Sequence, residues 1–382
     1  MCRPSQWQGS MPRNKPWLVI AQSGRALACS ATRAGLETCV IDRFADLDTL
    51  AVASNVRLIE DNNKDININK LIDILHEYSN MKFAGVVTGS GLESHVDILE
   101  FIKRHWPLYG NDAETVRACK DPVLFFDVLD KLGIPHPEVA SGICNIGGEW
   151  MVKHAGGAGG EHISRYVQGD RLPAGSYLQE KIKGRSLSVV FLADGKNCQM
   201  AGINEIWPVA SEKDDYRYQG AVTLPEFGAR LASDFREIAH TLVQALELKG
   251  LCGMDLIMDE NNQCHILEIN PRPTATFELH ERANSLFAAH VLACQGRLGP
   301  LPDPGNTYFA HKVMYAVEDF IMPEFVWPLW TTDRPTPGKV IRKDDPVCMI
   351  QVHADDIQGI HHLLDTRTQK LQQLLPMQKL AA

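Results

Sequence analysis

The feature that most constrains the fold is a pair of apolar runs that carry acidic and amide side chains. Residues 253–258 and 266–270 flank a polar turn, and this spacing predicts two adjacent antiparallel strands. In such a hairpin Asp255 lies beside Glu268 and Asn270. Carboxylates inside apolar strands are costly to bury unless a cation compensates their charge. Because Mg²⁺ prefers oxygen ligands, these side chains predict a magnesium site, and a solvated sheet face is the alternative.

A second constraint is a lysine on a strand that runs into a glycine-rich loop. Lys153 ends the apolar run 150–153. Four glycines share the loop that follows: Gly156, Gly157, Gly159 and Gly160. Glycine N–H groups can approach phosphate oxygens closely, and an ammonium group offsets their charge, so the pattern predicts a phosphate clamp. The loop matches neither the P-loop nor the dinucleotide fingerprint, so a mobile surface loop is the alternative.

The order of elements predicts several units. Apolar runs near residues 18–21, 38–42 and 83–87 alternate with helical segments, which is typical of a doubly wound parallel layer. We expect four successive parts, namely a disordered polar tail (1–16), this α/β layer (17–110), a two-lobed core (111–299) and a small β-rich cap with a C-terminal amphipathic helix (300–382).

Composition excludes several classes of protein. The chain has 382 residues, 45% of them hydrophobic, and a formal net charge of −9, which argues against a nucleic-acid or anionic-membrane surface. No apolar run approaches the roughly 20 residues of a membrane helix. The ten cysteines include no CxxC pair and predict free thiols in a reducing cytoplasm. A cytoplasmic protein with a small soluble substrate is therefore expected.

With these motifs the chain resembles the ATP-grasp superfamily, and within it carboligase-like enzymes related to biotin carboxylase and the carbamoyl-phosphate synthase large subunit. The most specific piece is the Glu-x-Asn-x-Arg arrangement of residues 268–272, with Asp255 thirteen residues before the glutamate. The resemblance implies an α/β (α+β) ATP-grasp fold, in which 17–110 is the pre-ATP-grasp layer and 111–299 the ATP-grasp domain. The lid of that domain is expected at about 121–182.

The resemblance also implies roles for residues. Lys120 and Lys153 would contact the ATP phosphates or the adenine side of the pocket, and the four loop glycines would fold over the β- and γ-phosphates. Four hinge residues would read adenine largely through their backbone: Gln179, Glu180, Lys181 and Ile182. Asp255, Glu268 and Asn270 would hold Mg²⁺, or Mn²⁺ in its place. Arg272 and Lys153 would be catalytic, with Arg272 stabilising the charge on the transferred phosphoryl group.

One position departs from the family pattern. Where many relatives carry an acid after the hinge to hold the ribose, this chain has Ser186, so the ribose contact must be weaker or come from elsewhere. The segment from Gly89 to Glu93 is a candidate for substrate contact. Glu278 and His280, just beyond the hairpin, are candidates for the acceptor site, whereas His154 and His162 beside the glycine loop are more simply read as solvated.

The predicted activity is ligation of a small-molecule carboxylate to an amine, through an acyl phosphate made with Mg-ATP. Two alternatives stay open: a carboxylase-like enzyme that forms carboxyphosphate from bicarbonate, and a nucleotide-binding regulatory protein without turnover. No biotin-carrier segment is visible. The resemblance points to tailoring of a methanopterin- or methanofuran-type cofactor in one-carbon metabolism, and no nucleic-acid or membrane partner is expected. A homodimer is compatible with the sequence.

Overall fold

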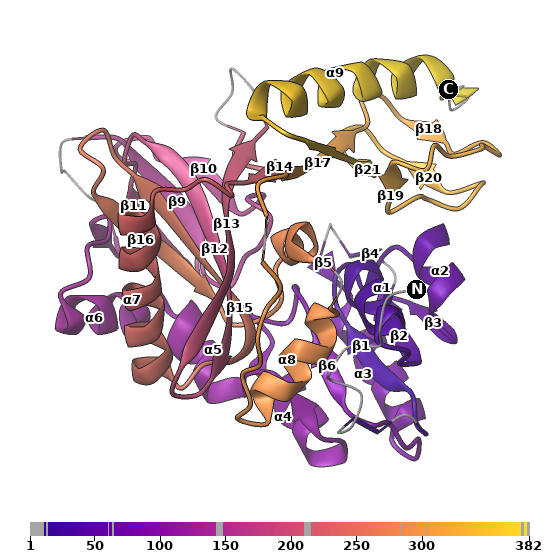
Figure 1. The fold of residues 1–382 in the computed structure, drawn as a ribbon, viewed down its shortest axis with the longest axis horizontal. Helices are drawn as coiled ribbons and strands as arrows, with labels where there is room; N and C mark the ends of the chain where they lie inside the picture. The colour runs from indigo at the N-terminus through magenta and orange to yellow at the C-terminus, as the bar shows by residue number, and fades with distance from the viewer. Residues whose placement is uncertain are drawn as a thin grey trace.

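The computed structural model describes residues 11–12, 14–59, 61–62, 65–142, 148–209, 215–282, 284–303, 305–375 and 378–379. Within these ranges an antiparallel sheet of eight strands, which differ in length, occupies the middle of the molecule (Figure 1). A parallel layer packs on one side of it, and a smaller lid sheet lies at the opposite end. The mixed α/β architecture predicted from the sequence is confirmed.

The N-terminal layer is a five-stranded sheet with the order β3-β2-β1-β6-β7, and all of its pairings are parallel. Its elements are β1 (Trp17–Ile20), α1 (Arg25–Arg33), β2 (Thr38–Asp42), α2 (Leu47–Val52), β3 (Asn55–Leu58), α3 (Ile68–Tyr78), β6 (Val86–Thr88), α4 (Val96–His105) and β7 (Leu108–Tyr109), with a short β4 (Asp61–Asn62) and β5 (Asp65–Ile66) pair. Every residue of β1 and β2 is buried, because helices cover both faces of the sheet.

The lid follows two helices, α5 (Ala113–Lys120) and α6 (Pro122–Leu132). Asp121 caps α6 by accepting a hydrogen bond from the Val123 N–H, and Gly133 ends it in the left-handed conformation at φ 64°. Four strands then pair in the order β10-β9-β11-β8: β8 (Val139–Ala140), β9 (Trp150–His154), β10 (Ile163–Arg165) and β11 (Ser176–Glu180). These strands form one small sheet with its own apolar cluster around Trp150 and Leu178, inside the segment 121–182 predicted to be the lid.

The central sheet has eight strands in the order β16-β15-β12-β13-β14-β17-β21-β19. They are β12 (Arg185–Asp194), β13 (Cys198–Pro208), β14 (Tyr218–Thr223), β15 (Lys249–Met258), β16 (Cys264–Asn270), β17 (Tyr308–Tyr315), β19 (Thr331–Thr332) and β21 (Pro346–Ala354). Helix α7 (Ala229–Leu246) covers one face, and the largest apolar cluster lies between them. Helix α8 (Leu286–Cys294) is almost entirely buried between β15 and the N-terminal layer.

The C-terminal region is built differently from an isolated cap. Strand β17 pairs with β14 on one side and with β21 on the other, so both strands continue the central sheet. Helix α9 (Ile357–Leu374) lies across these two strands, as Figure 1 shows, and its apolar face is core packing as expected. The short strands β18 (Phe320–Ile321), β20 (Val340–Ile341) and β22 (Gln378–Lys379) form a separate three-stranded sheet beside them.

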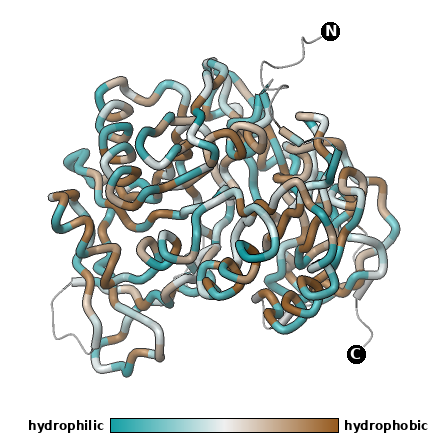
Figure 2. The backbone as a smooth tube through the Cα atoms, turned by 90° about the horizontal axis from the view of Figure 1, so that it is seen from below, coloured by the Kyte–Doolittle hydropathy of each residue, from teal (hydrophilic) through white to brown (hydrophobic). Residues whose placement is uncertain are grey.

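Hydrophobic and hydrophilic stretches alternate along the backbone tube of Figure 2. Within the described ranges, no helix is both long and apolar enough to cross a lipid bilayer.

Candidate active site

The β15–β16 hairpin brings the predicted metal-binding side chains together. Asp255 is in register with Glu268, and Gly253 with Asn270. The Asn270 amide nitrogen donates to Asp255 Oδ2 at 2.8 Å and to Glu268 Oε1 at 3.2 Å. Asn270 is buried, and the Glu268 side chain is 28% exposed. The hairpin therefore presents two carboxylates and one amide from a single place, as the sequence predicted.

Lys120, at the end of α5, reaches the same group of oxygens. Its Nζ atom lies 3.1 Å from Glu268 Oε2 and 2.7 Å from Asn270 Oδ1. Lys153 on β9 is buried, and its Nζ atom donates to the side-chain oxygen of Gln179 at 3.1 Å. Burial, together with the charge of Lys120, lowers the pKa of Lys153, although Glu268 and Asp255 oppose the shift. Two ammonium groups thus flank the hairpin carboxylates.

The pKa values of the two hairpin carboxyls are shifted in opposite directions. Burial, with the charge of Glu268, raises the pKa of Asp255 to about 7. Burial also acts against ionisation of Glu268, but Lys120 and Lys153 outweigh it and lower the pKa of that carboxyl. One carboxyl is therefore firmly ionised, while the other lacks enough nearby positive charge to be ionised fully at neutral pH.

These residues fit a hard divalent cation. In the ranges that the structure describes, no three His, Cys, Asp or Glu side chains gather into a metal site, so the set depends on the amide oxygen of Asn270 as its third ligand. That oxygen and Glu268 already accept hydrogen bonds from a cation, the Lys120 ammonium. Oxygen donors and an under-compensated Asp255 suit Mg²⁺, which would release Lys120 to other anionic groups.

Arg272 is held by a residue that the sequence did not pair with it. Its Nε atom donates to Glu93 Oε1, and one terminal nitrogen donates to Asn270 Oδ1 at 3.2 Å. Glu93 is buried and also accepts the Gly91 N–H at 2.6 Å. Burial opposes its ionisation, but Arg272 and Lys120 lower the pKa of Glu93. The segment expected to contact substrate thus supplies the carboxylate that orients Arg272.

The glycine loop lies directly over the hairpin. Gly156 and Gly160 have φ of 75° and 80°, values that favour glycine. A Cβ atom on Gly157 would lie 2.2 Å from the His162 ring, and one on Gly160 would lie 1.9 Å from the Tyr216 carbonyl oxygen. The loop and Glu268 line a cavity of about 20 Å³, which holds about one water molecule. A nucleotide therefore requires the loop to move outward.

The two histidines beside this loop differ in their surroundings. His154 is exposed, as expected. His162 is half-buried against Gly157, and burial lowers its pKa to about 4, so the ring is neutral at physiological pH.

Two of the predicted hinge residues already use their backbone N–H groups in hydrogen bonds within the protein. The Glu180 N–H donates to the Glu138 carbonyl at 2.9 Å, and the Lys181 N–H donates to the Glu149 carbonyl at 2.8 Å. Backbone reading of adenine would thus fall to carbonyl oxygens and to Ile182. Ser186 pairs with Ile257 on β15, beside the hinge.

A second cavity, of about 210 Å³, lies between the N-terminal layer, the segment after Arg272 and the C-terminal strands. Its lining includes Gly89 and Ser90, and also Pro273 and Thr274, which follow Arg272 directly. Glu278, on the 3₁₀ helix η1 (Ala275–His280), faces this cavity. His280 does not, because it lines other cavities and its Nε2 atom is 2.9 Å from Asn204 Oδ1.

Comparison with known proteins places the site in a family. Residues 119–276 match the family model described as "ATP-grasp domain". The chain carries an ATP-grasp domain. This match spans Lys120, the glycine loop, the hinge and the whole hairpin, and it confirms the superfamily predicted from the motifs.

Solved ATP-grasp structures cover nearly the whole chain. Biotin carboxylase from Campylobacter jejuni superposes with a TM-score of 0.72 at 14% identity, over 93% of this chain and 91% of that one. L-amino acid ligase from Bacillus licheniformis gives 0.70 at 12% identity, over 97% and 100%. These similarities show the ATP-grasp fold, and they include both a carboxylase and a ligase.

Sequence relatives match over shorter stretches. The arginine-specific large chain of carbamoyl phosphate synthase from Bacillus subtilis is 21% identical over 220 residues, which are 52% of this chain and 21% of that one. The chain spans about a third or less of the length of the curated relatives it matches.

Proposed function

We propose that the protein is an ATP-dependent carboxylate–amine ligase that forms ADP and phosphate. The observation that carries this proposal is the convergence on one hairpin of two carboxylates, an amide and three cationic side chains. The cations are Lys120, Lys153 and Arg272. Carboxylates hold Lys120 and Arg272 in this structure, and a triphosphate with its metal ion would exchange places with those carboxylates.

The reaction has two steps. A carboxylate oxygen attacks the γ-phosphorus of ATP, the bond to the β-phosphate oxygen breaks, and ADP leaves. The amine nitrogen then attacks the carbonyl carbon of the acyl phosphate, inorganic phosphate leaves, and the nitrogen loses a proton. Mg²⁺ or Mn²⁺, when held by Asp255, Glu268 and Asn270, would neutralise phosphate charge.

The chain's own side chains would position the phosphates of ATP and neutralise their negative charge. Lys120 and Lys153 would contact phosphate oxygens, the latter at low desolvation cost because it is already buried and anchored by Gln179. Arg272, fixed by Glu93, would face the charge that develops on the transferred phosphoryl group. The glycine loop would close over the acyl phosphate and exclude water.

Two other functions are less well supported. Bicarbonate is small and hydrophilic, whereas the cavity beside Arg272 is lined mostly by apolar side chains and suits an organic acceptor. A binding-only protein has no need for Arg272 to be held by a dedicated buried carboxylate. For the pathway, the resemblance extends the proposal to tailoring of a methanopterin- or methanofuran-type cofactor.

Product formation tests the proposal directly. Purified protein is incubated with Mg-ATP and a panel of carboxylates, first with hydroxylamine to trap acyl phosphates as hydroxamates and then with a panel of amines. We expect hydroxamate and ADP only with particular carboxylates, and an amide product only when an amine is added. ADP release that depends on bicarbonate alone would support the carboxylase instead, and no nucleotide turnover with any pair would contradict the ligase.

A further inference from the structure

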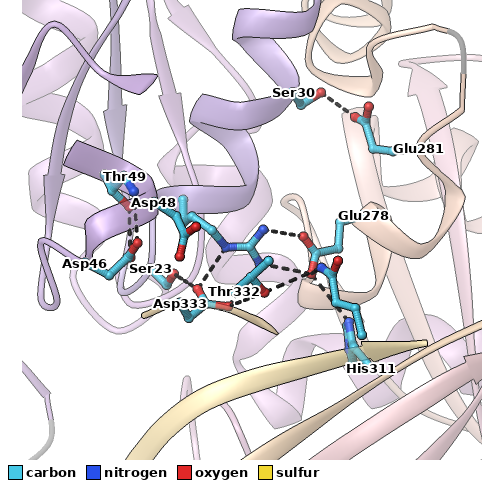
Figure 3. A network of polar contacts seen from close by, with 12 residues as sticks. Ser23, Ser30, Asp46, Asp48, Thr49, Glu278, Glu281, His311, Thr332 and Asp333 are labelled. Atoms are coloured by element: carbon cyan, nitrogen blue, oxygen red, sulfur yellow. Dashed lines mark hydrogen bonds and ion pairs between the residues drawn. The ribbon is translucent and has the colours of Figure 1, made fainter. Parts of the chain in front are cut away.

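The 210 Å³ cavity is lined by a group of charged side chains and by many apolar side chains. Arg25, on α1, is buried there between two carboxylates from distant elements, Glu278 and Asp333, both of which are labelled in Figure 3. It donates to Glu278 at 2.6 and 2.9 Å and to Asp333 at 3.0 Å twice. Because these four hydrogen bonds use most of its N–H groups and two carboxylates offset its charge, Arg25 is committed to the protein rather than to an anionic ligand. It joins the N-terminal layer to η1 and to the turn after β19.

Asp46 is the third carboxylate of this lining. It caps α2, and its oxygens accept from the Thr49 N–H and hydroxyl, both at 2.9 Å, as Figure 3 shows. It is only 1% exposed and lines the cavity, yet within the described ranges no Lys or Arg forms an ion pair with it. Burial, together with the charges of Asp333 and Asp42, raises the pKa of Asp46 to about 6.

The other cation of the cavity, Lys339, compensates Asp46 only in part, because it acts on Asp42 as well. Lys339 lies over the Phe44 ring at 4.9 Å, and its Nζ atom donates to the Phe44 carbonyl at 3.4 Å. The lining therefore contains three carboxylates (Asp46, Glu278 and Asp333) and two cations (Arg25 and Lys339). The lining thus carries one formal negative charge more than positive, in a largely apolar space.

We propose that this cavity binds the acceptor of the reaction as a small primary amine with an apolar body, its ammonium group on the Asp46 side. The inference rests on the proposed ligase function and names the class of amine. At about 210 Å³ the cavity is smaller than the roughly 300–1,000 Å³ of sites for drug-sized ligands, so the apolar body is short. Its lining includes Pro273 and Thr274, which directly follow Arg272 in the chain and so link the cavity to the hairpin site.

Equilibrium binding tests this without catalysis. Dissociation constants of n-hexylamine, 1-hexanol and hexanoate are measured by calorimetry on the full chain at neutral pH. We expect n-hexylamine to bind about tenfold or more tightly than 1-hexanol, because only the ammonium gains a charge-assisted contact, and hexanoate to bind weakest. Tighter binding of hexanoate, or no binding of n-hexylamine, would overturn the inference.

Two variants locate the contact. Asp46→Asn keeps the helix cap, because the amide oxygen can still accept the Thr49 N–H, but it removes the charge. It should weaken the binding of n-hexylamine about tenfold and change the dissociation constant of 1-hexanol by no more than about twofold. Ala26→Phe should weaken both ligands by filling the cavity. Asp365→Asn, on the exposed face of α9, is the matched control. Equal n-hexylamine binding in Asp46→Asn and the control would contradict the assignment.

The outcome also separates this inference from the ligase proposal. If carboxylates yield hydroxamate but n-hexylamine does not bind, the ligase stands and the amine site is wrong. If n-hexylamine binds through Asp46 but no carboxylate yields hydroxamate, the cavity is an amine site and the ligase is wrong.

Discussion

The hairpin site and the 210 Å³ cavity are both lined by buried charges, but they differ in charge balance. Around the hairpin three carboxylates face three cations: Asp255, Glu268 and Glu93 against Lys120, Lys153 and Arg272. In the cavity three carboxylates face two cations. The formal charges around the hairpin balance, although Asp255 is under-compensated, so ligands there must exchange partners with the residues present. In the cavity, the proposed ligand would instead add the missing positive charge.

The largest effect is expected from Glu268→Gln. This change keeps the size of the side chain but removes the charge that holds Lys120 and the proposed metal ion. We expect at least about a thousandfold loss of ADP release, because metal and phosphate positioning fail together, with little change in the far-UV spectrum. Asp255→Asn should behave in the same way. The control is Glu260→Gln in the exposed turn of the hairpin, and near-normal turnover in Glu268→Gln would refute exchange of partners at this site.

Arg272→Ala should come next, with two separable consequences. Loss of the guanidinium should lower kcat by about 100- to 1,000-fold and change KM for ATP little, since its role lies in the transition state. It also leaves Glu93 buried and unpaired, at a cost of about 3–5 kcal/mol in the free energy of unfolding. Urea unfolding and steady-state kinetics measure the two effects.

The double variant Arg272→Ala with Glu93→Ala divides these effects. Removing both partners should restore much of the stability while kcat stays low. If the double variant recovered both, Arg272 would be a structural residue and the balance of the hairpin site would have no catalytic meaning.

The two regions also differ in how much of each could be predicted from the sequence. Asp255, Glu268 and Asn270 lie on two strands joined by one turn, so a local pattern was enough to predict their meeting. Lys153 and the glycines of the following loop are also close together in the sequence, so a local pattern was enough to single them out. The parallel layer was predictable because apolar runs alternate with helical ones, although β3 and β7 were too short or too polar to stand out.

Contacts between residues that are far apart in the sequence have no such local pattern. Glu93 is 179 residues from Arg272, and Arg25 is 308 residues from Asp333. Arg25 follows a glycine turn that on its own indicates only a change of chain direction. In the same way, the strand propensity of β17 and β21 was visible, but not that they would extend the central sheet, because a strand's pattern does not name its partner.

The smallest predicted effect tests whether the cavity carries excess negative charge. The pKa of Asp46 is raised from 3.8 to about 6 by burial and by Asp333 and Asp42, while Lys339 and Arg334 carry the nearby positive charges. The folded state therefore keeps a proton that the unfolded chain has lost. Its stabilising contribution is full below pH 4 and disappears as the pH rises through about 6.

A shift of about two pKa units corresponds to about 3 kcal/mol at most. The difference in unfolding free energy between wild type and Asp46→Asn should therefore change by up to that amount between pH 4 and pH 7, in favour of the variant at the higher pH. Other groups titrate in both proteins and cancel in the difference. A saturating amine should reduce this change, because its ammonium group stabilises the ionised carboxylate. A difference that does not vary with pH would mean that Asp46 is already compensated, and the contrast between the two sites would no longer hold.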